Sequence, residues 1–243
     1  MTDVWGQVDL VLVVDTTGSM GPFIVEACRS ARASLASYAE QGDLDLRVAM
    51  VEYRDHVDAF TVRVYPFTSD LDGFQGALDQ LVADGGGDRP EAVLDGLIAA
   101  CKLDWRPFAD RLLFLIGDSP PHDPCACKAT ANGTAEYLLG QRVKVHAFSI
   151  AGESDTTKAF SEFSEVTGGT VREAEARMVV AASGAPMAAA VGSISDSRTY
   201  YAASMDTAVD WRAPESVNLV SAQLGWSVEK TARVRAYMEG RTA

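Results

Sequence analysis

The chain has 243 residues, which is enough for one large α/β domain with a small extension but short for two full domains. Hydrophobic residues make up 47% and charged residues 23% of the sequence, an ordinary globular composition that argues against a disordered chain. With 21 Lys and Arg against 34 Asp and Glu, the net charge of −13 disfavours nucleic-acid phosphates and anionic membranes as partners and favours cations or basic partner surfaces.

The first elements of the chain form a strand, a helix and a hairpin. Residues 8–15 are a β-branched apolar run, typical of a strand that is buried on both faces of a sheet. A turn at residues 18–21 leads to Pro22, which suits the first position of a helix. Residues 44–53 and 60–67 predict two strands joined by a polar link, and hence an antiparallel hairpin.

The middle of the chain continues with helices around a glycine-rich loop. Residues 71–81 have helical periodicity, and the glycine run 85–87 leads to Pro90, where we expect the next helix to begin. An apolar stripe continues that helix to Cys101, and residues 111–116 predict another buried strand.

The remaining predicted elements keep the alternation. We expect a helix over residues 129–139, a strand over 143–150, a helix over 159–166 that ends at a Gly-Gly pair, and a short strand over 170–172. Strands separated by helices indicate an α/β fold of the doubly wound, Rossmann-like type. Its central sheet is predicted to be mostly parallel, with one antiparallel edge strand.

Two further features concern the domain boundary and the compartment. A composition shift near residue 195 predicts one domain over residues 1–198 and a small helical extension over 199–243, with helix expected at 214–239. We expect a cytoplasmic protein, because the first apolar run lacks a preceding basic residue and residues 178–194 contain Gly, Pro and Ser. The four cysteines form no disulfide framework, and Cys101 is predicted to be a small core residue.

Oxygen-bearing side chains gather at the predicted carboxyl edge of the sheet, where ligands bind in open parallel sheets. Asp15 closes the first strand and opens a loop that presents Thr17 and Ser19, Asp88 lies in the glycine-rich loop, and Asp118 closes the strand 111–116. Each feature alone is compatible with a helix cap or a turn. Together they form a hard oxygen set, which favours Mg²⁺, or else Mn²⁺ or Ca²⁺, over Zn²⁺ or Cu²⁺.

Four motifs in order resemble the von Willebrand factor A domain, in its bacterial and α-kinase-associated branch. They are DTTGS at 15–19, YRDH at 53–56, GGDRPEA at 86–92 and DSPPH at 118–122. The resemblance spans residues 6–195 and implies a metal-ion-dependent adhesion site. It also implies that Thr17 and Ser19 coordinate the cation directly, whereas Asp15 and Asp118 act mostly through metal-bound waters.

Asp88 departs from the family pattern, in which many members place a threonine in the middle loop. The site then carries three carboxylates against a divalent cation. The additional charge is expected to strengthen cation capture and to weaken the attraction of the bound cation for an acidic ligand group.

His122, Cys125 and Cys127 lie close together in the sequence PPHDPCAC. A zinc site and a redox pair are both conceivable, but only three candidate ligands appear and no fourth is evident nearby, which favours an ordinary loop. We expect His56 to stabilise the hairpin link through hydrogen bonds rather than to act as a base.

Two rival functions remain. A metal-dependent phosphohydrolase of the haloacid-dehalogenase type needs a second aspartate two residues after the first, and that position is Thr17. A DNA-binding helix-turn-helix in the tail would use Ser221, Gly225 and Thr231, but the residues from 214 on carry a balance of only +1. The sequence therefore favours a non-catalytic module that binds a protein partner through a divalent cation, with no nucleic acid and no membrane involved.

Overall fold

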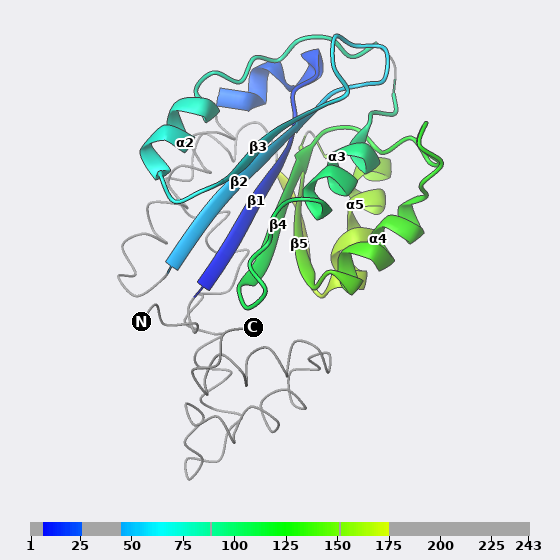
Figure 1. Cartoon of the computed structure of the whole chain (residues 1–243). Coiled ribbons are helices and arrows are strands. Elements are labelled where there is room, and N and C mark those ends of the chain that lie inside the picture. Colours follow the sequence, from blue (N-terminus) through cyan, green and yellow to red (C-terminus); the bar gives the residue numbers. More distant parts are fainter. Residues whose placement is uncertain (1–6, 26–44, 88, 151, 175–243) are drawn as a thin grey trace, which may run out of the picture. The chain divides into compact units, whose positions relative to one another are not determined.

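A single six-stranded sheet forms the centre of the computed structural model (Figure 1), which describes residues 7–25, 45–87, 89–150 and 152–174. The strands are β1 (Gln7–Asp15), β2 (Asp45–Tyr53), β3 (Val62–Thr68), β4 (Asp110–Gly117), β5 (Val143–Ile150) and β6 (Thr170–Ala174). All six lie where the apolar runs predict them, and the bounds of β5 coincide with the prediction.

The strand order is β3-β2-β1-β4-β5-β6, and every neighbouring pair is parallel except β2 and β3. This confirms the predicted doubly wound sheet with one antiparallel edge strand. β1 lies between β2 and β4, where Asp15 pairs with Tyr53 and Val14 pairs with Ile116. The carboxyl ends of these three strands therefore meet at one edge of the sheet.

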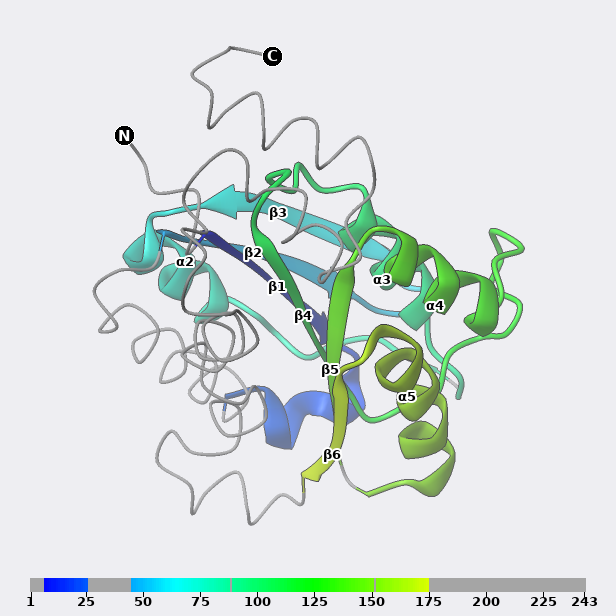
Figure 2. The ribbon, with the colours of Figure 1, turned by 90° about the horizontal axis from the view of Figure 1, so that it is seen from below.

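The helices form a layer on each face of the sheet. They are α2 (Leu71–Leu78), α3 (Val93–Cys101), α4 (Ala131–Gly140) and α5 (Ser154–Thr167). Figure 2 shows α3, α4 and α5 on one face, with α2 and the helical turn at residues 21–25 on the other.

Burial on both faces explains the continuous apolar runs of the central strands. Alternate residues of β1 point to opposite faces, and Val11 and Val13 belong to the core cluster that α3, α4 and α5 cover. Leu10 and Leu12 point to the other face and are equally buried. A strand that is buried in this way shows no alternation of polar and apolar residues.

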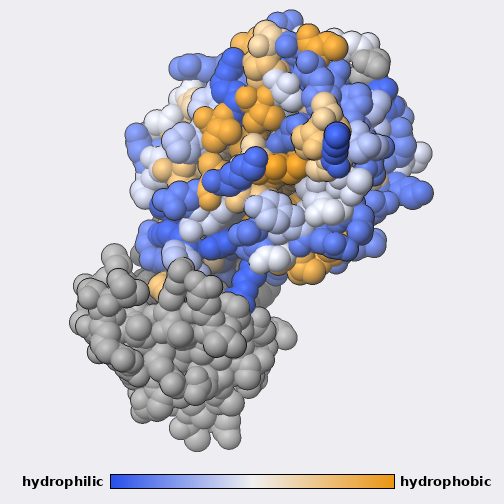
Figure 3. Space-filling view, turned by 45° about the vertical axis from the view of Figure 1, so that its right-hand side comes forward, coloured by the Kyte–Doolittle hydropathy of each residue, from blue (hydrophilic) through white to orange (hydrophobic). Residues whose placement is uncertain are grey.

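The outer surface of the layer formed by α3, α4 and α5 is mostly hydrophilic. Figure 3 shows apolar residues gathered in smaller areas between the hydrophilic ones. Tyr137 and Leu139 of α4 are among the exposed large hydrophobic side chains of the described residues.

One boundary prediction is wrong. Pro90 does not begin a helix, because Glu91 forms a parallel β-bridge with Pro121 and α3 begins only at Val93. The backbone N–H of Glu91 donates to the carbonyl of Pro120 at 3.0 Å, and that of Ala92 donates to the carbonyl of Arg54 at 3.1 Å. These long-range bonds tie the chain before α3 to the segments after β4 and β2, and α3 begins only at Val93.

Several predictions fall outside the described residues. They are the continuation of the first helix beyond residue 25, the domain boundary at 198, and the helix expected at 214–239. Within the described ranges, no helix is long and apolar enough to cross a membrane.

Candidate functional site

Asp15 and Asp118 come together because β1 and β4 are parallel neighbours. Asp15 is the last residue of β1, and Asp118 directly follows β4. The two carboxylates are close enough for the charge of Asp118 to raise the pKa of Asp15. The convergence that the sequence predicts at the carboxyl edge is therefore present for these two residues.

The loop after β1 brings the side chains of Thr17 and Ser19 to Asp15. Both the backbone N–H and the Oγ1 hydroxyl of Thr17 donate to Asp15 Oδ1, at 2.8 and 2.7 Å. Thr17 Oγ1 lies 3.2 Å from Ser19 Oγ. Three oxygens from alternate residues thus form one group, which is the arrangement expected from the spacing of these residues.

Asp15 is fully buried, and one of its oxygens is left unsatisfied. By distance and angle neither Asp15 Oδ2 nor the hydroxyl of Tyr53 has a hydrogen-bond partner, although the two groups are close enough for the hydroxyl to lower the pKa of Asp15. Burial is the main cause that raises the pKa of Asp15 from 3.8 to about 7, and hydrogen bonds from Thr17 oppose it. A buried carboxylate oxygen without a partner costs free energy, which a cation would offset.

Glu91 lines the candidate site, although its place within the motif at 86–92 does not by itself mark it as a ligand. Its side chain is buried, Glu91 Oε2 has no hydrogen-bond partner, and the residue lines the same cleft as Thr17 and Asp118. Burial, followed by the charges of Asp15 and Asp55, raises the pKa of Glu91 to about 8. The backbone bonds of Glu91 and Ala92 to Pro120 and Arg54 hold the segment that brings this carboxylate to the cleft.

The glycine-rich loop lies against the loop after β1. The backbone N–H of Gly18 donates to the carbonyl of Gly85 at 3.0 Å, and Asp58 accepts from the N–H of Gly86 at 2.9 Å. Gly85 and Gly86 have φ angles of 75° and 73°, in a region of backbone conformation that residues other than glycine rarely adopt. Asp88 lies outside the described residues, whereas its neighbours Gly87 and Arg89 line the cleft.

These residues surround an open cleft of about 650 Å³ at the carboxyl edge of the sheet. Arg89 stands at its rim, where its guanidinium pairs with Asp155 at 3.0 Å and with Glu153 at 3.6 Å. The cleft is lined by Thr17, Gly18, Ser19, Gly85, Gly86, Gly87, Arg89, Glu91, Asp118, Ser119 and Glu153.

Beside the cleft lies a cluster of histidines, acidic residues and a disulfide. Asp55 Oδ1 lies 2.8 Å from His122 Nε2, and His56 Nε2 lies 3.0 Å from Asp95 Oδ2. His56 thus joins the hairpin link to α3 through a hydrogen bond, in keeping with the stabilising role expected for it.

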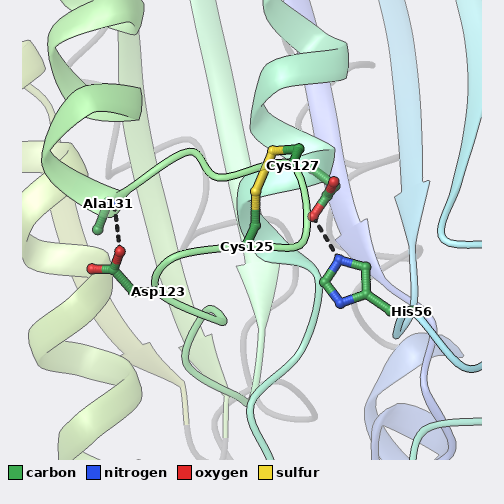
Figure 4. Close-up of a disulfide and its surroundings, with 6 residues drawn as sticks. His56, Asp123, Cys125, Cys127 and Ala131 are labelled. Atoms are coloured by element: carbon green, nitrogen blue, oxygen red, sulfur yellow. Dashed lines mark hydrogen bonds and ion pairs between the residues drawn. A yellow bond between two sulfur atoms is a disulfide. The ribbon is translucent and has the colours of Figure 1, made fainter.

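Figure 4 shows a disulfide between Cys125 and Cys127 in the loop between β4 and α4. Two of the four cysteines, for which no disulfide framework is expected from the sequence, are thus joined in this loop. Cys101 is a free and buried thiol, which confirms its predicted place in the core.

Comparisons with known proteins agree with this architecture. The sequence profile of the von Willebrand factor A domain matches residues 9–176. The α-protein kinase vwkA of Dictyostelium discoideum is 32% identical over 118 residues, which are 47% of this chain but only 19% of that protein. The chain therefore matches a small part of this relative.

Solved structures share the fold at low sequence identity. An aerotolerance-related membrane protein from Bacteroides fragilis has a TM-score of 0.57 at 15% identity and covers 78% of this chain and 99% of its own. A von Willebrand factor type A protein from Catenulispora acidiphila has a TM-score of 0.55 at 16% identity, over 72% of this chain and 41% of that one. These likenesses concern the fold alone.

Proposed function

This chain belongs to the von Willebrand factor A domain family, and from that premise we propose that it binds a protein partner through a divalent cation at the carboxyl edge of its sheet. The cation is held by Asp15, Thr17, Ser19 and Asp118, and Asp88 adds a further carboxylate. Binding of a partner, not catalysis, is the role that we assign to this site.

The observation that carries the proposal is the unsatisfied oxygen of Asp15 within a group of converging oxygens. Asp15 Oδ2 is buried without a partner, while Thr17 and Ser19 hold their hydroxyls next to Asp15 Oδ1. A divalent cation would satisfy the buried carboxylate and would restore its ionised form at neutral pH. The donor set consists of carboxylates and hydroxyls, which suits Mg²⁺, Mn²⁺ or Ca²⁺.

The negative charge around the cation site affects which partner surface the site would attract. Glu91 adds a carboxylate to the cleft beyond those that the sequence singles out, and Asp88 follows a residue of its lining. These groups reduce the attraction of a bound cation for an acidic partner group. The net charge of −13 favours a partner that has basic surface around the contact.

A phosphohydrolase function is the alternative from another class. Such an enzyme would need an aspartate two residues after Asp15, and the structure has Thr17 there, with its hydroxyl committed to Asp15 Oδ1. Thr17 has no group that titrates near neutral pH and therefore does not serve as a general acid or base. Turnover of a generic phosphate ester with Mg²⁺ would contradict our assignment of binding.

Calorimetric titration with Mg²⁺ and Mn²⁺ tests the proposal. We expect one site per chain in the wild type and no measurable binding in Asp15→Asn, because the amide keeps the shape of the side chain but removes the charge. Asp72→Asn is the matched control, since Asp72 is an exposed aspartate in the first turn of α2, away from the cleft lining.

The partner-binding half of the proposal has its own test. With the immobilised chain as bait, EDTA and Asp15→Asn should each release the captured partner, and Asp72→Asn should retain it. Equal capture with and without the cation would contradict the metal-dependent mode.

A further inference from the structure

We propose that the reduced protein binds a second divalent cation of the thiophilic, Zn²⁺ type through Cys125, Cys127 and Asp95, with His56 as the adjacent fourth ligand. One ligand atom from each of the first three residues lies within 4.8 Å of the others. His56 Nε2 lies 3.0 Å from Asp95 Oδ2. This site is separate from the cation site of the proposed function and does not depend on it.

The spacing of these atoms suits a tetrahedral cation. With bonds of about 2.3 Å to sulfur and about 2.0 Å to nitrogen or oxygen, the ligands of a tetrahedral zinc lie about 3.3 to 3.8 Å apart. The ligand atoms of Asp95, Cys125 and Cys127 lie within 4.8 Å of one another, and the two sulfurs are free to separate once their bond is reduced, so side-chain rotations are sufficient to close the site around an ion. Two thiolates with an imidazole and a carboxylate form a set that zinc prefers over magnesium.

Long-range contacts already position His56. Its Nδ1 atom faces Asp55 Oδ1 at 3.7 Å while Nε2 faces Asp95. Asp55 also holds His122, whose ring centroid lies 5.0 Å from that of His56. A histidine that binds zinc commonly directs its second ring nitrogen at a carboxylate, and Asp55 Oδ1, at 3.7 Å, would have to approach His56 Nδ1 more closely to form that bond.

The loop with the cysteines is tied to the fold. The backbone N–H of Cys125 donates to the carbonyl of Ala129 at 2.9 Å, and Asp123 accepts from the N–H of Ala131 at the start of α4 (Figure 4). Cys125 is buried whereas Cys127 is exposed, so the cluster has a preformed inner side and an outer side open to a metal ion from solvent. Asp95 lies in the first turn of α3, a regular element that fixes its position.

The thiols become available when the Cys125–Cys127 disulfide is reduced. A trialkylphosphine and one water molecule reduce the bond, giving two thiols and one phosphine oxide, so that the phosphine supplies both electrons and water supplies the two protons and the oxygen. Binding of Zn²⁺ then releases the two thiol protons to solvent, because thiolates are the ligands. The oxidised protein lacks the thiolates and has no such site.

Cobalt titration of the phosphine-reduced protein tests the inference, with excess Mg²⁺ present to occupy the carboxylate site. Co²⁺ bound by thiolates absorbs in the near ultraviolet through sulfur-to-metal charge transfer, a signal that oxygen ligands do not give. We expect one equivalent of Co²⁺ to produce this band and Zn²⁺ to abolish it. Oxidised protein should show no band, and Cys125→Ser and Asp95→Asn should weaken binding by about tenfold or more.

Matched variants separate this site from other groups. Cys101→Ala and Asp72→Asn remove a thiol and a first-turn aspartate outside the cluster, and both should keep the band. Asp15→Asn should also keep it while losing Mg²⁺ binding, so the two cation proposals can fail independently.

A measurement on the wild type alone guards against variants that do not fold. Zn²⁺ should protect Cys125 and Cys127 of the reduced protein from alkylation, as measured by peptide mass spectrometry. Absence of the charge-transfer band in reduced wild type, or unchanged alkylation with Zn²⁺, would overturn the inference.

Discussion

Asp15 is more deeply buried than Asp118 or Glu91, and one of its carboxylate oxygens has no hydrogen-bond partner. Burial disfavours the charged form of a carboxylate, while the two hydrogen bonds from Thr17 favour it. The pKa of about 7 shows that burial has the larger effect. The metal-free protein therefore carries a carboxylate whose ionisation opposes folding.

Stability of the metal-free protein should depend on pH through Asp15. Its pKa is raised from 3.8 to about 7 in the folded state, so the folded protein holds this proton more tightly and loses stability as pH rises between these values. A shift of this size corresponds to at most about 4 kcal/mol. In EDTA, Asp15→Asn should match the wild type in free energy of unfolding below pH 4 and exceed it at pH 8.

Chemical denaturation at the two pH values measures that difference. Glu91, whose pKa is raised to about 8 partly by the charge of Asp15, acts in the same direction. Asp15→Asn removes that charge and lowers the pKa of Glu91 as well, so the measured difference includes both contributions. A difference between wild type and variant that stays constant with pH would contradict the prediction.

The contribution of Asp88 can be tested although it lies outside the described residues. If its carboxylate acts on the cation, Asp88→Thr removes one negative charge close to the metal. A change of about 1.4 kcal/mol would weaken Mg²⁺ binding about tenfold. We expect that loss by calorimetry, together with stronger binding of acetate or an acidic peptide to the metal-loaded variant.

Glu91→Gln provides the comparison, because Glu91 lines the cleft directly. Unchanged Mg²⁺ affinity in Asp88→Thr alongside a clear loss in Glu91→Gln would assign the additional charge to Glu91 instead.

At the scale of elements, the junction between α5 and β6 shows how closely helix and sheet approach each other. Gly168 ends α5 in the left-handed conformation with φ of 73°, and the N–H of Gly169 donates to the carbonyl of Ser164 at 2.7 Å. A Cβ atom on Gly169 would collide with the backbone carbonyl of Val145 in β5, whereas one on Gly168 would meet open space.

Alanine at these two glycines should therefore have unequal effects. Gly168→Ala places a side chain at positive φ and should cost about 1–2 kcal/mol of unfolding free energy. Gly169→Ala forces the backbone of β5 or the chain after α5 to move, and should cost about 3 kcal/mol or more. Chemical denaturation of both variants measures the costs, and equal values would contradict the collision.

On the scale of the whole molecule, a cation that binds only the folded chain stabilises it by mass action. At one hundred times the dissociation constant the gain is about 2.7 kcal/mol. Mg²⁺ should therefore raise the melting temperature of the wild type in a concentration-dependent way, and EDTA should reverse the rise. In Asp15→Asn the melting temperature should not respond to Mg²⁺, and a response equal to that of the wild type would place the cation elsewhere.

Much of the fold could be predicted from the sequence because the signals are local. The apolar run that forms β5 and the Gly-Gly pair that ends α5 can each be recognised from a few neighbouring residues. Parallel neighbours then place Asp15 and Asp118 at one edge, so these site residues follow from strand ends alone. The spacing of Thr17 and Ser19 is equally local.

What the sequence by itself determined is thus the alternation of strands and helices and the oxygen group of the loop after β1. Only the tertiary structure decided the conformation after Pro90. There the N–H of Ala92 donates to the carbonyl of Arg54, and the helix begins one residue later, at Val93. It alone brought Glu91 into the cleft and His56 to Asp95, two residues separated by 39 positions. Contacts across such distances depend on how the strands are ordered in the sheet, which no local pattern of residues encodes.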